Sequence, residues 1–124
     1  MPIYESGEDY LETIYLLGKK KSGVHAVDVA TELGFSKPSV TKAMNILKKN
    51  GYIVIDESNH IILTKTGTSR AEEVYARHCT VTVFLMSLGV SAETAEKDAC
   101  RIEHIISAET FERIKERTQK RTEV

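Results

Sequence analysis

The stretch KDACRIEHIIS, residues 97–107, places a thiol, a carboxylate and an imidazole three and four residues apart, at Cys100, Glu103 and His104. Side chains at positions i, i+3 and i+4 share one face of an α-helix, so on a helix all three could bind a single cation. This mixture of sulfur, oxygen and nitrogen donors suits a divalent transition metal better than Mg²⁺ or Ca²⁺. The ordinary alternative is that Cys100 packs in the core while Glu103 and His104 lie in solvent.

The same residues also suggest a nucleophile, Cys100, with His104 as its base. Two side chains of one helix leave no evident third orienting group and no oxyanion site, so we expect that the chain is not an enzyme. The second cysteine, Cys79, is predicted to be a core residue. Two cysteines do not make a disulfide framework.

Length and composition bound the class of protein. A chain of 124 residues forms one domain, or one domain with a dimerisation extension, which excludes a large multi-domain enzyme. The net charge is −1, and 41% hydrophobic with 28% charged residues is typical of a soluble globular protein. The acidic start MPIYESGEDY lacks a signal-peptide core, and no apolar stretch reaches the roughly 18 residues of a membrane span. We therefore expect a cytoplasmic protein without a membrane partner.

Three helices are predicted in the first 50 residues. The first has a helical apolar stripe and ends at Gly18, and the second stops at Gly34, a good C-terminal cap. The third begins at the N-cap Ser36, with Pro38 in its first turn. The positions expected to face inward are Tyr10, Leu11, Ile14, Tyr15 and Leu17 in the first helix, Val29, Ala30 and Leu33 in the second, and Val40, Ala43, Met44 and Leu47 in the third.

The second and third helices, joined through Gly34, predict a helix-turn-helix whose second helix enters the DNA major groove. Two β-rich runs, 52–55 and 61–64, flank the polar tip 56–60 and predict the hairpin of a winged helix. Residues 18–50 carry seven lysines against two acidic residues, a local charge of +5 that leaves −6 for the rest. This segregation favours DNA binding, although surface lysines alone are also common on solvated helices. The predicted DNA-contacting residues are Ser36, Lys37, Pro38, Ser39, Thr41 and Lys42.

The C-terminal half is predicted to be helical. A long helix begins within residues 64–67, has apolar positions at Val74, Val81, Phe84 and Leu85, and ends before Gly89; Ser91 and Ser107 are N-caps of two further helices. The polar tail from about residue 116 is expected to fray. These helices are too short and apolar to form a second independent core, so we interpret them as a dimer interface.

The expected fold is therefore mainly α, with a winged helix-turn-helix DNA-binding domain followed by a C-terminal helical dimerisation region. The first comprises residues 1–66, and the second, which also binds the metal, comprises residues 67–124. A homodimer of such units would read the two half-sites of a palindromic operator in double-stranded DNA.

Four motifs together resemble the diphtheria toxin repressor family of metal-dependent regulators: EDYLETIYLL, SKPSVTKAMNILKKNGYI, LTKTG and ACRIEHIIS. The similarity spans nearly the whole chain and is greatest to the short manganese-regulator branch, which lacks an SH3-like domain. The resemblance implies a homodimeric transcriptional repressor activated by Mn²⁺ or Fe²⁺, with Co²⁺ or Zn²⁺ as substitutes in vitro. It further implies control of genes for metal-ion uptake and homeostasis.

The family's ligand pattern implies a metal site made of Asp9, Glu12, His78, Cys100, Glu103 and His104. Asp9 and Glu12 match the manganese branch, which however has glutamate at position 100. Cys100 matches the iron-responsive branch, so this chain mixes two ligand sets, and sulfur shifts the preference toward iron, cobalt or zinc. Thr82 departs from the iron branch, which has a glutamate of its ancillary site there.

Ordinary alternatives remain at the sequence level. Asp9 and Glu12 are also typical of exposed carboxylates early in a helix, and a single histidine such as His78 is often just a hydrogen-bonded one. A winged-helix regulator could instead respond to an organic ligand, or to thiol oxidation at Cys79 or Cys100. In the hypothesis of a metal-activated regulator, an ion bound by helices from both halves would fix the DNA-binding unit relative to the dimer axis.

Overall fold

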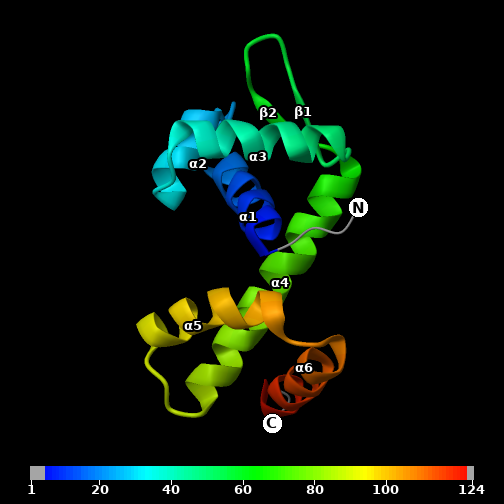
Figure 1. Ribbon diagram of the computed structural model, residues 1–124. Coiled ribbons are helices and arrows are strands. Elements are labelled where there is room, and N and C mark those ends of the chain that lie inside the picture. The colour runs from blue at the N-terminus through cyan, green and yellow to red at the C-terminus, as the bar shows by residue number, and fades with distance from the viewer. Residues whose placement is uncertain (1–4, 123–124) are drawn as a thin grey trace. The chain divides into compact units, whose positions relative to one another are not determined.

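The computed structural model describes residues 5–122, and the side chains of residues 7–119. Its elements are α1 (Glu5–Lys20), α2 (Ala26–Leu33), α3 (Lys37–Lys49), β1 (Ile53–Ile55), β2 (Ile61–Leu63), α4 (Lys65–Ser87), α5 (Ala92–Ile105) and α6 (Ala108–Thr122) (Figure 1). The predicted mainly α class is confirmed. The chain divides into two compact units, the first ending at Glu72 and the second beginning at Glu73, within α4. None of the described helices is long and apolar enough to cross a membrane.

The core of the first unit collects the inward faces of α1, α2 and α3. The apolar residues less than a tenth exposed on these helices are Tyr10, Leu11, Ile14, Val29, Ala30, Val40, Met44 and Leu47. Burying each large aliphatic side chain contributes roughly 1.5–3 kcal/mol, so this stripe is the main source of the unit's stability. The predicted inward positions of the three helices are thus confirmed, with Tyr15, Leu17, Leu33 and Ala43 only partly buried.

A helix-turn-helix joins α2 to α3. Gly34 has a left-handed backbone (φ 71°), and its N–H donates to the carbonyl oxygen of Ala30 at 2.9 Å, which ends α2. The hydroxyl of Ser36 then accepts a hydrogen bond from the N–H of Ser39, with Pro38 in the first turn of α3. Both features were predicted from the sequence, and they leave the lysine-bearing face of α3 exposed.

The hairpin projects from one side of α3 (Figure 1). Its strands pair antiparallel, with Val54 opposite Ile62, and each is one residue shorter than predicted. Val24, in the loop between α1 and α2, forms an isolated bridge to Ile61, whose N–H donates to the Val24 carbonyl oxygen at 2.7 Å. The base of the wing is thereby joined to the loop that precedes α2.

Helix α4 begins close against the start of the hairpin. The hydroxyl of Thr64 accepts a hydrogen bond from the N–H of Gly67 and donates to the carbonyl oxygen of Gly51. A Cβ placed on Gly67 would overlap the carbonyl oxygen of Tyr52, so only glycine allows this approach.

The second unit contains the C-terminal part of α4, with α5 and α6. Gly89 (φ 100°) follows α4, and the hydroxyls of Ser91 and Ser107 accept hydrogen bonds from the N–H groups of Thr94 and Thr110. These three boundaries agree with the sequence prediction. Among the described residues of this unit, those buried as a whole are Val74, Val81, Ala95, Ala99 and Glu103, and the exposed large hydrophobic ones are Val83, Met86, Leu88 and Ile105.

Two expectations about the second unit are wrong. Cys79 is exposed rather than buried. Its position on α4 is two residues from the buried Val81, or about 200° around the helix, which turns the thiol away from the buried side. The C-terminal tail also does not fray at residue 116, because α6 remains helical to Thr122.

Candidate metal centre

Glu103, on α5, is a fully buried carboxylate with an imidazole beside each oxygen. Its side chain is 0% exposed. Nδ1 of His78, on α4, lies 2.9 Å from Oε2 of Glu103, and Nε2 of His104 lies 3.3 Å from Oε1. Two histidines from different helices thus converge on one acidic side chain.

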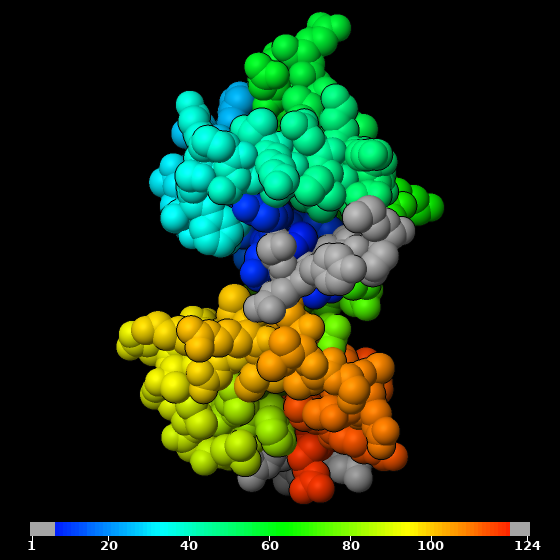
Figure 2. Space-filling view, viewed as in Figure 1, coloured from blue at the N-terminus to red at the C-terminus, as the bar shows by residue number. Residues whose placement is uncertain are grey.

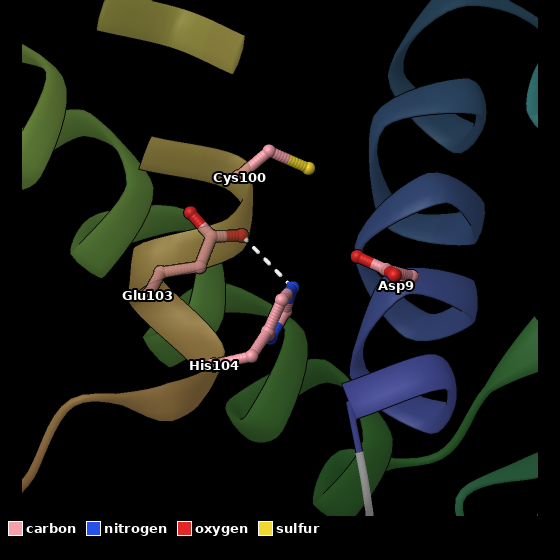
Figure 3. Close-up of side chains that lie close together, drawn as sticks. All are labelled: Asp9, Cys100, Glu103 and His104. Carbon is pink, nitrogen blue, oxygen red and sulfur yellow. Dashed lines mark ion pairs between the residues drawn. The ribbon is translucent and has the colours of Figure 1, made fainter. Parts of the chain in front are cut away.

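Cys100, Glu103 and His104 project from one face of α5 (Figure 3). One ligand atom from each, a thiol sulfur, a carboxylate oxygen and an imidazole nitrogen, lies within 4.8 Å of the others. The helical spacing predicted this shared face. The alternative, with Cys100 in the core and Glu103 and His104 in solvent, is wrong. The side chains of Glu103 and His104 are buried, and Cys100 is exposed.

The sequence of α5 explains why Glu103 is buried. The N-cap Ser91 fixes the start of the helix, and the buried positions Ala95, Ala99 and Glu103 follow at intervals of four residues. Intervals of four keep side chains on one helical face. The inward stripe of α5 therefore ends in a carboxylate instead of an apolar side chain.

The residues present fit a metal ion. Among the described residues, Oε1 of Glu103 is buried and accepts no hydrogen bond, with only the ion-pair contact to His104. A buried acceptor without a hydrogen bond costs about 1–3 kcal/mol, and buried polar atoms in native proteins are rarely left so. A divalent cation at this oxygen would remove that cost. Carboxylate, imidazole and thiol donors together favour a transition metal. We call His78, Cys100, Glu103 and His104 the α4–α5 cluster.

Asp9 and Glu12, the other predicted ligands, lie on α1 in the first unit, three residues apart and both partly buried (Figure 3 labels Asp9). Side chains at this spacing share a helical face. Burial, and after it the negative charge of Asp9, raise the pKa of the neighbouring Tyr10. Asp9 thus lies in a partly desolvated part of α1 and not at a fully hydrated helix end.

The six predicted DNA-contacting residues are all exposed at the start of α3, which lies on the surface of the first unit (turquoise in Figure 2). They are Ser36, Lys37, Pro38, Ser39, Thr41 and Lys42. A groove of about 310 Å³ between α3 and the hairpin is also lined by three polar side chains that were not among these candidates, His25, Asn45 and Asn59. Asn45 could have been found from its spacing of four residues from Thr41, whereas Asn59 required the fold of the wing.

Comparison with known proteins gives two matching family models. The N-terminal DNA binding domain of iron dependent repressors matches residues 3–61, and the metal binding and dimerisation domain of the same repressors matches residues 64–123.

Individual relatives agree. An HTH-type transcriptional regulator of Methanocaldococcus jannaschii is 34% identical over 113 residues, which cover 90% of each chain. The transcriptional regulator MntR of Escherichia coli is 38% identical over 113 residues, which cover 91% of this chain and 73% of that protein. The solved structure of the manganese regulator SloR superposes with a TM-score of 0.79 at 28% identity, covering 94% of this chain. The chain spans about half of SloR, 54% of its length.

Proposed function

This chain belongs to the family of iron-dependent repressors, which are metal-dependent transcriptional regulators, and on that premise we propose that Mn²⁺ or Fe²⁺ activates it as a homodimeric, DNA-binding repressor. Its operator is a palindrome, and the regulated genes serve the uptake and homeostasis of the same metal. Such a regulator acts in the cytoplasm, where the DNA is. Since the family consists of transcriptional repressors and not of enzymes, Cys100 and His104 are not a catalytic pair.

The observation that carries this proposal is the buried Glu103 between two histidines. A buried carboxylate needs a positively charged partner. A bound divalent ion would supply the positive charge beside Oε1, which accepts no hydrogen bond from the described residues. His78, Glu103 and His104 would hold the ion, and the ion would act as an effector without taking part in any reaction.

We further propose that Asp9 and Glu12 supply oxygen ligands to the same ion. The support is their residue type, their shared face on α1 and the family ligand pattern implied by the sequence. An ion bound by α1 and by the α4–α5 cluster would favour the arrangement of the two units that fits DNA. DNA would then raise the metal affinity by the same factor as the metal raises the DNA affinity.

Cys100 is proposed to set the choice of metal. An exposed thiol beside the buried carboxylate and imidazole adds a soft ligand, which favours Fe²⁺, Co²⁺ or Zn²⁺ over Mn²⁺. Cys100→Ser should therefore shift the relative affinity toward Mn²⁺, as competition between Mn²⁺ and Co²⁺ measures. Cys79→Ser, at the other exposed thiol, is the matched control and should leave the ratio unchanged.

For DNA binding we propose that the exposed start of α3 enters the major groove. The lysines Lys37 and Lys42 would contact phosphates, while the side chains of Ser39 and Thr41 reach base edges. Ser36 and Pro38 set the start of the helix and lie against the backbone of the DNA. The hairpin is the wing.

We propose that the functional boundary follows residue 66, with residues 67–124 forming the dimerisation and metal-binding region. The exposed hydrophobic residues Val83, Met86, Leu88 and Ile105 of α4, α5 and their connection are the proposed contact surface between two copies. Exposed large apolar side chains that gather in one patch are typical of a protein interface.

The experiment is a fluorescence-anisotropy titration of an operator-like duplex under anaerobic conditions, with Mn²⁺, Fe²⁺, Co²⁺ and Zn²⁺ in turn. We expect tight binding only with metal, and Asp9→Ala should lose this dependence while sedimentation still reports a dimer. Asp98→Ala, at an exposed carboxylate of α5, is the control and should behave as the parent chain.

Equal DNA affinity with and without every metal would refute the proposal. In that case, alkylation of the exposed thiols in metal-free protein tests the alternative of a thiol-responsive regulator.

A further inference from the structure

The chain has four histidines, and the two that do not belong to the α4–α5 cluster meet at the base of the wing. His25 is the N-cap residue of α2, and His60 directly precedes β2. Their rings are in edge-to-face contact, with centroids 4.7 Å apart. Both side chains are more than a third exposed, so an ion from solvent can reach them. We call His25 and His60 the wing histidines.

Each wing histidine has a carboxylate on the Nδ1 side of its ring. Nδ1 of His60 lies 3.1 Å from Oδ2 of Asp56, and Nδ1 of His25 lies 3.7 Å from Oδ2 of Asp28. At His60 the carboxylate is within hydrogen-bond distance, which favours the proton on Nδ1 and leaves the lone pair on Nε2, whereas Asp28 lies near Nδ1 of His25 without a hydrogen bond to it. Histidines that bind metals in proteins are usually oriented in this way.

The two carboxylates are themselves held in place. Oδ1 of Asp56 accepts hydrogen bonds from the N–H groups of Ser58 and His60, both at 2.9 Å. Oδ2 of Asp28 accepts from the N–H of His25 at 2.8 Å and from Nζ of Lys21 at 2.9 Å. The hydrogen bond from the backbone N–H of His60 lowers the pKa of Asp56. The hydrogen bond from the backbone N–H of His25 likewise lowers the pKa of Asp28. Both groups are therefore anionic near neutral pH.

A glycine lets the backbone pass close to the ring of His60. Gly23 has a positive φ of 82°, and a Cβ on it would lie 2.6 Å from Nε2 of His60. A cavity of about 350 Å³ adjoins this point and is lined by Lys21, Gly23, Asp56 and His60 among others. Any other residue at position 23 would press its Cβ against the face of the His60 ring, so the glycine allows this ring to take its place beside His25.

We propose that His25 and His60 form a second metal site, separate from the α4–α5 cluster, for an imidazole-preferring ion such as Zn²⁺. With Zn–N bonds of about 2.0–2.1 Å, two imidazoles on one tetrahedral ion have ring centroids about 5 Å apart, close to the separation observed here. Asp56 orients the ring of His60, and water completes the coordination. Mn²⁺, which favours oxygen ligands, binds poorly at such a site.

An ion at this position would join the first residue of the helix-turn-helix to the base of the wing. His25 precedes α2 and His60 precedes β2, and among the described residues these segments are linked through the backbone by the Val24–Ile61 bridge. Zn²⁺ would add a second, side-chain link, which should reduce amide hydrogen exchange in the hairpin.

The test uses the full chain carrying His78→Gln and His104→Gln, which removes the histidines of the α4–α5 cluster. Calorimetry with Zn²⁺ should still show one ion per chain. Adding His25→Gln or His60→Gln should abolish that binding, and Asp56→Asn should weaken it by about 10-fold or more. The same background should take up little Mn²⁺.

If the background variant does not fold, as circular dichroism would reveal, imidazole ¹⁵N spectra of the unmodified chain replace it. Zn²⁺ should then shift the Nε2 resonances of His25 and His60 in addition to those of His78 and His104. Zn²⁺ binding that is indifferent to His25→Gln and His60→Gln, or ¹⁵N shifts confined to His78 and His104, would overturn the second site. Neither result bears on the proposed repressor function, because Mn²⁺-dependent DNA binding is measured separately.

Discussion

Replacement of Glu103 by glutamine separates the two roles that its carboxylate combines. Glutamine keeps the shape of the side chain and still offers an oxygen to Nδ1 of His78, but it removes the negative charge. In the metal-free chain, Oε1 accepts no hydrogen bond from the described residues. The cost of such an atom is about 1–3 kcal/mol, and an amide NH₂ beside Nε2 of His104 can recover part of it. Glu103→Gln should therefore be as stable as the parent chain in EDTA, or more stable by about 1 kcal/mol.

With metal the order should reverse. A chain that binds one ion gains about 2.7 kcal/mol of stability at a free metal concentration 100 times its Kd. Without the charged oxygen at position 103, this gain should fall close to zero. The predicted signature is thus a variant that is no worse than the parent chain in EDTA and less stable than it by about 2 kcal/mol with saturating metal.

Urea unfolding followed by circular dichroism measures both differences. The protein concentration is held fixed, because the proposed dimerisation would make the apparent stability depend on it. A loss of about 3–5 kcal/mol in EDTA would refute the reasoning, since it would mean that the carboxylate already forms a complete buried ion pair with a protonated histidine. An undiminished gain with metal would show that Glu103 is not a ligand.

Three other predictions concern the first unit. Gly67→Ala should destabilise the fold by about 1–3 kcal/mol, because the added Cβ overlaps the carbonyl of Tyr52. Gly18→Ala is the control: the space around this position is open, so alanine should stabilise helix α1 by about 0.5–1 kcal/mol. Urea unfolding measures both changes in the free energy of unfolding. Lys42→Ala should weaken operator binding and reduce the slope of log K against log salt by about 0.9, as anisotropy at several salt concentrations measures; an unchanged slope would mean that Lys42 contacts no phosphate. Asp28→Asn should lower stability at neutral pH. The pKa of Asp28 is lower in the folded chain than its value of about 3.9 in the unfolded chain, so the ionised carboxylate stabilises the fold above about pH 3.9, and this stabilisation is lost as the pH falls through the folded-state pKa. Unfolding curves of the two proteins should therefore converge in acid.

The helices and their caps were predictable because their signals are local. The apolar spacing of Val40, Met44 and Leu47 determines which side of α3 is buried, and Gly34 and Ser36 mark the turn before it. The shared face of Cys100, Glu103 and His104 follows from helical geometry in the same way. Each of these features depends on residues fewer than ten positions apart.

The features that the residues alone could not predict depend on tertiary contacts, and the convergence of His78 and Glu103 was expected only from the family resemblance. The approach of His78 to Glu103 joins two helices, and the meeting of His25 with His60 joins a helix start to a hairpin. Cys79 was assigned to the core from its residue type, although its angular position on α4 is opposite that of Val81. Residue type alone gave the wrong burial there because the helix decides which side chains face inward.

The shortness of the hairpin strands bears on solubility. The wing exposes an apolar cross-strand pair, Val54 and Ile62, on strands that project from the first unit. A longer exposed strand of this kind would invite edge-to-edge association between molecules. Strands of three residues, followed by a polar tip with Asp56 and Glu57, offer too little backbone for another chain to pair with. The shortness of these strands therefore protects the protein from aggregation through that edge.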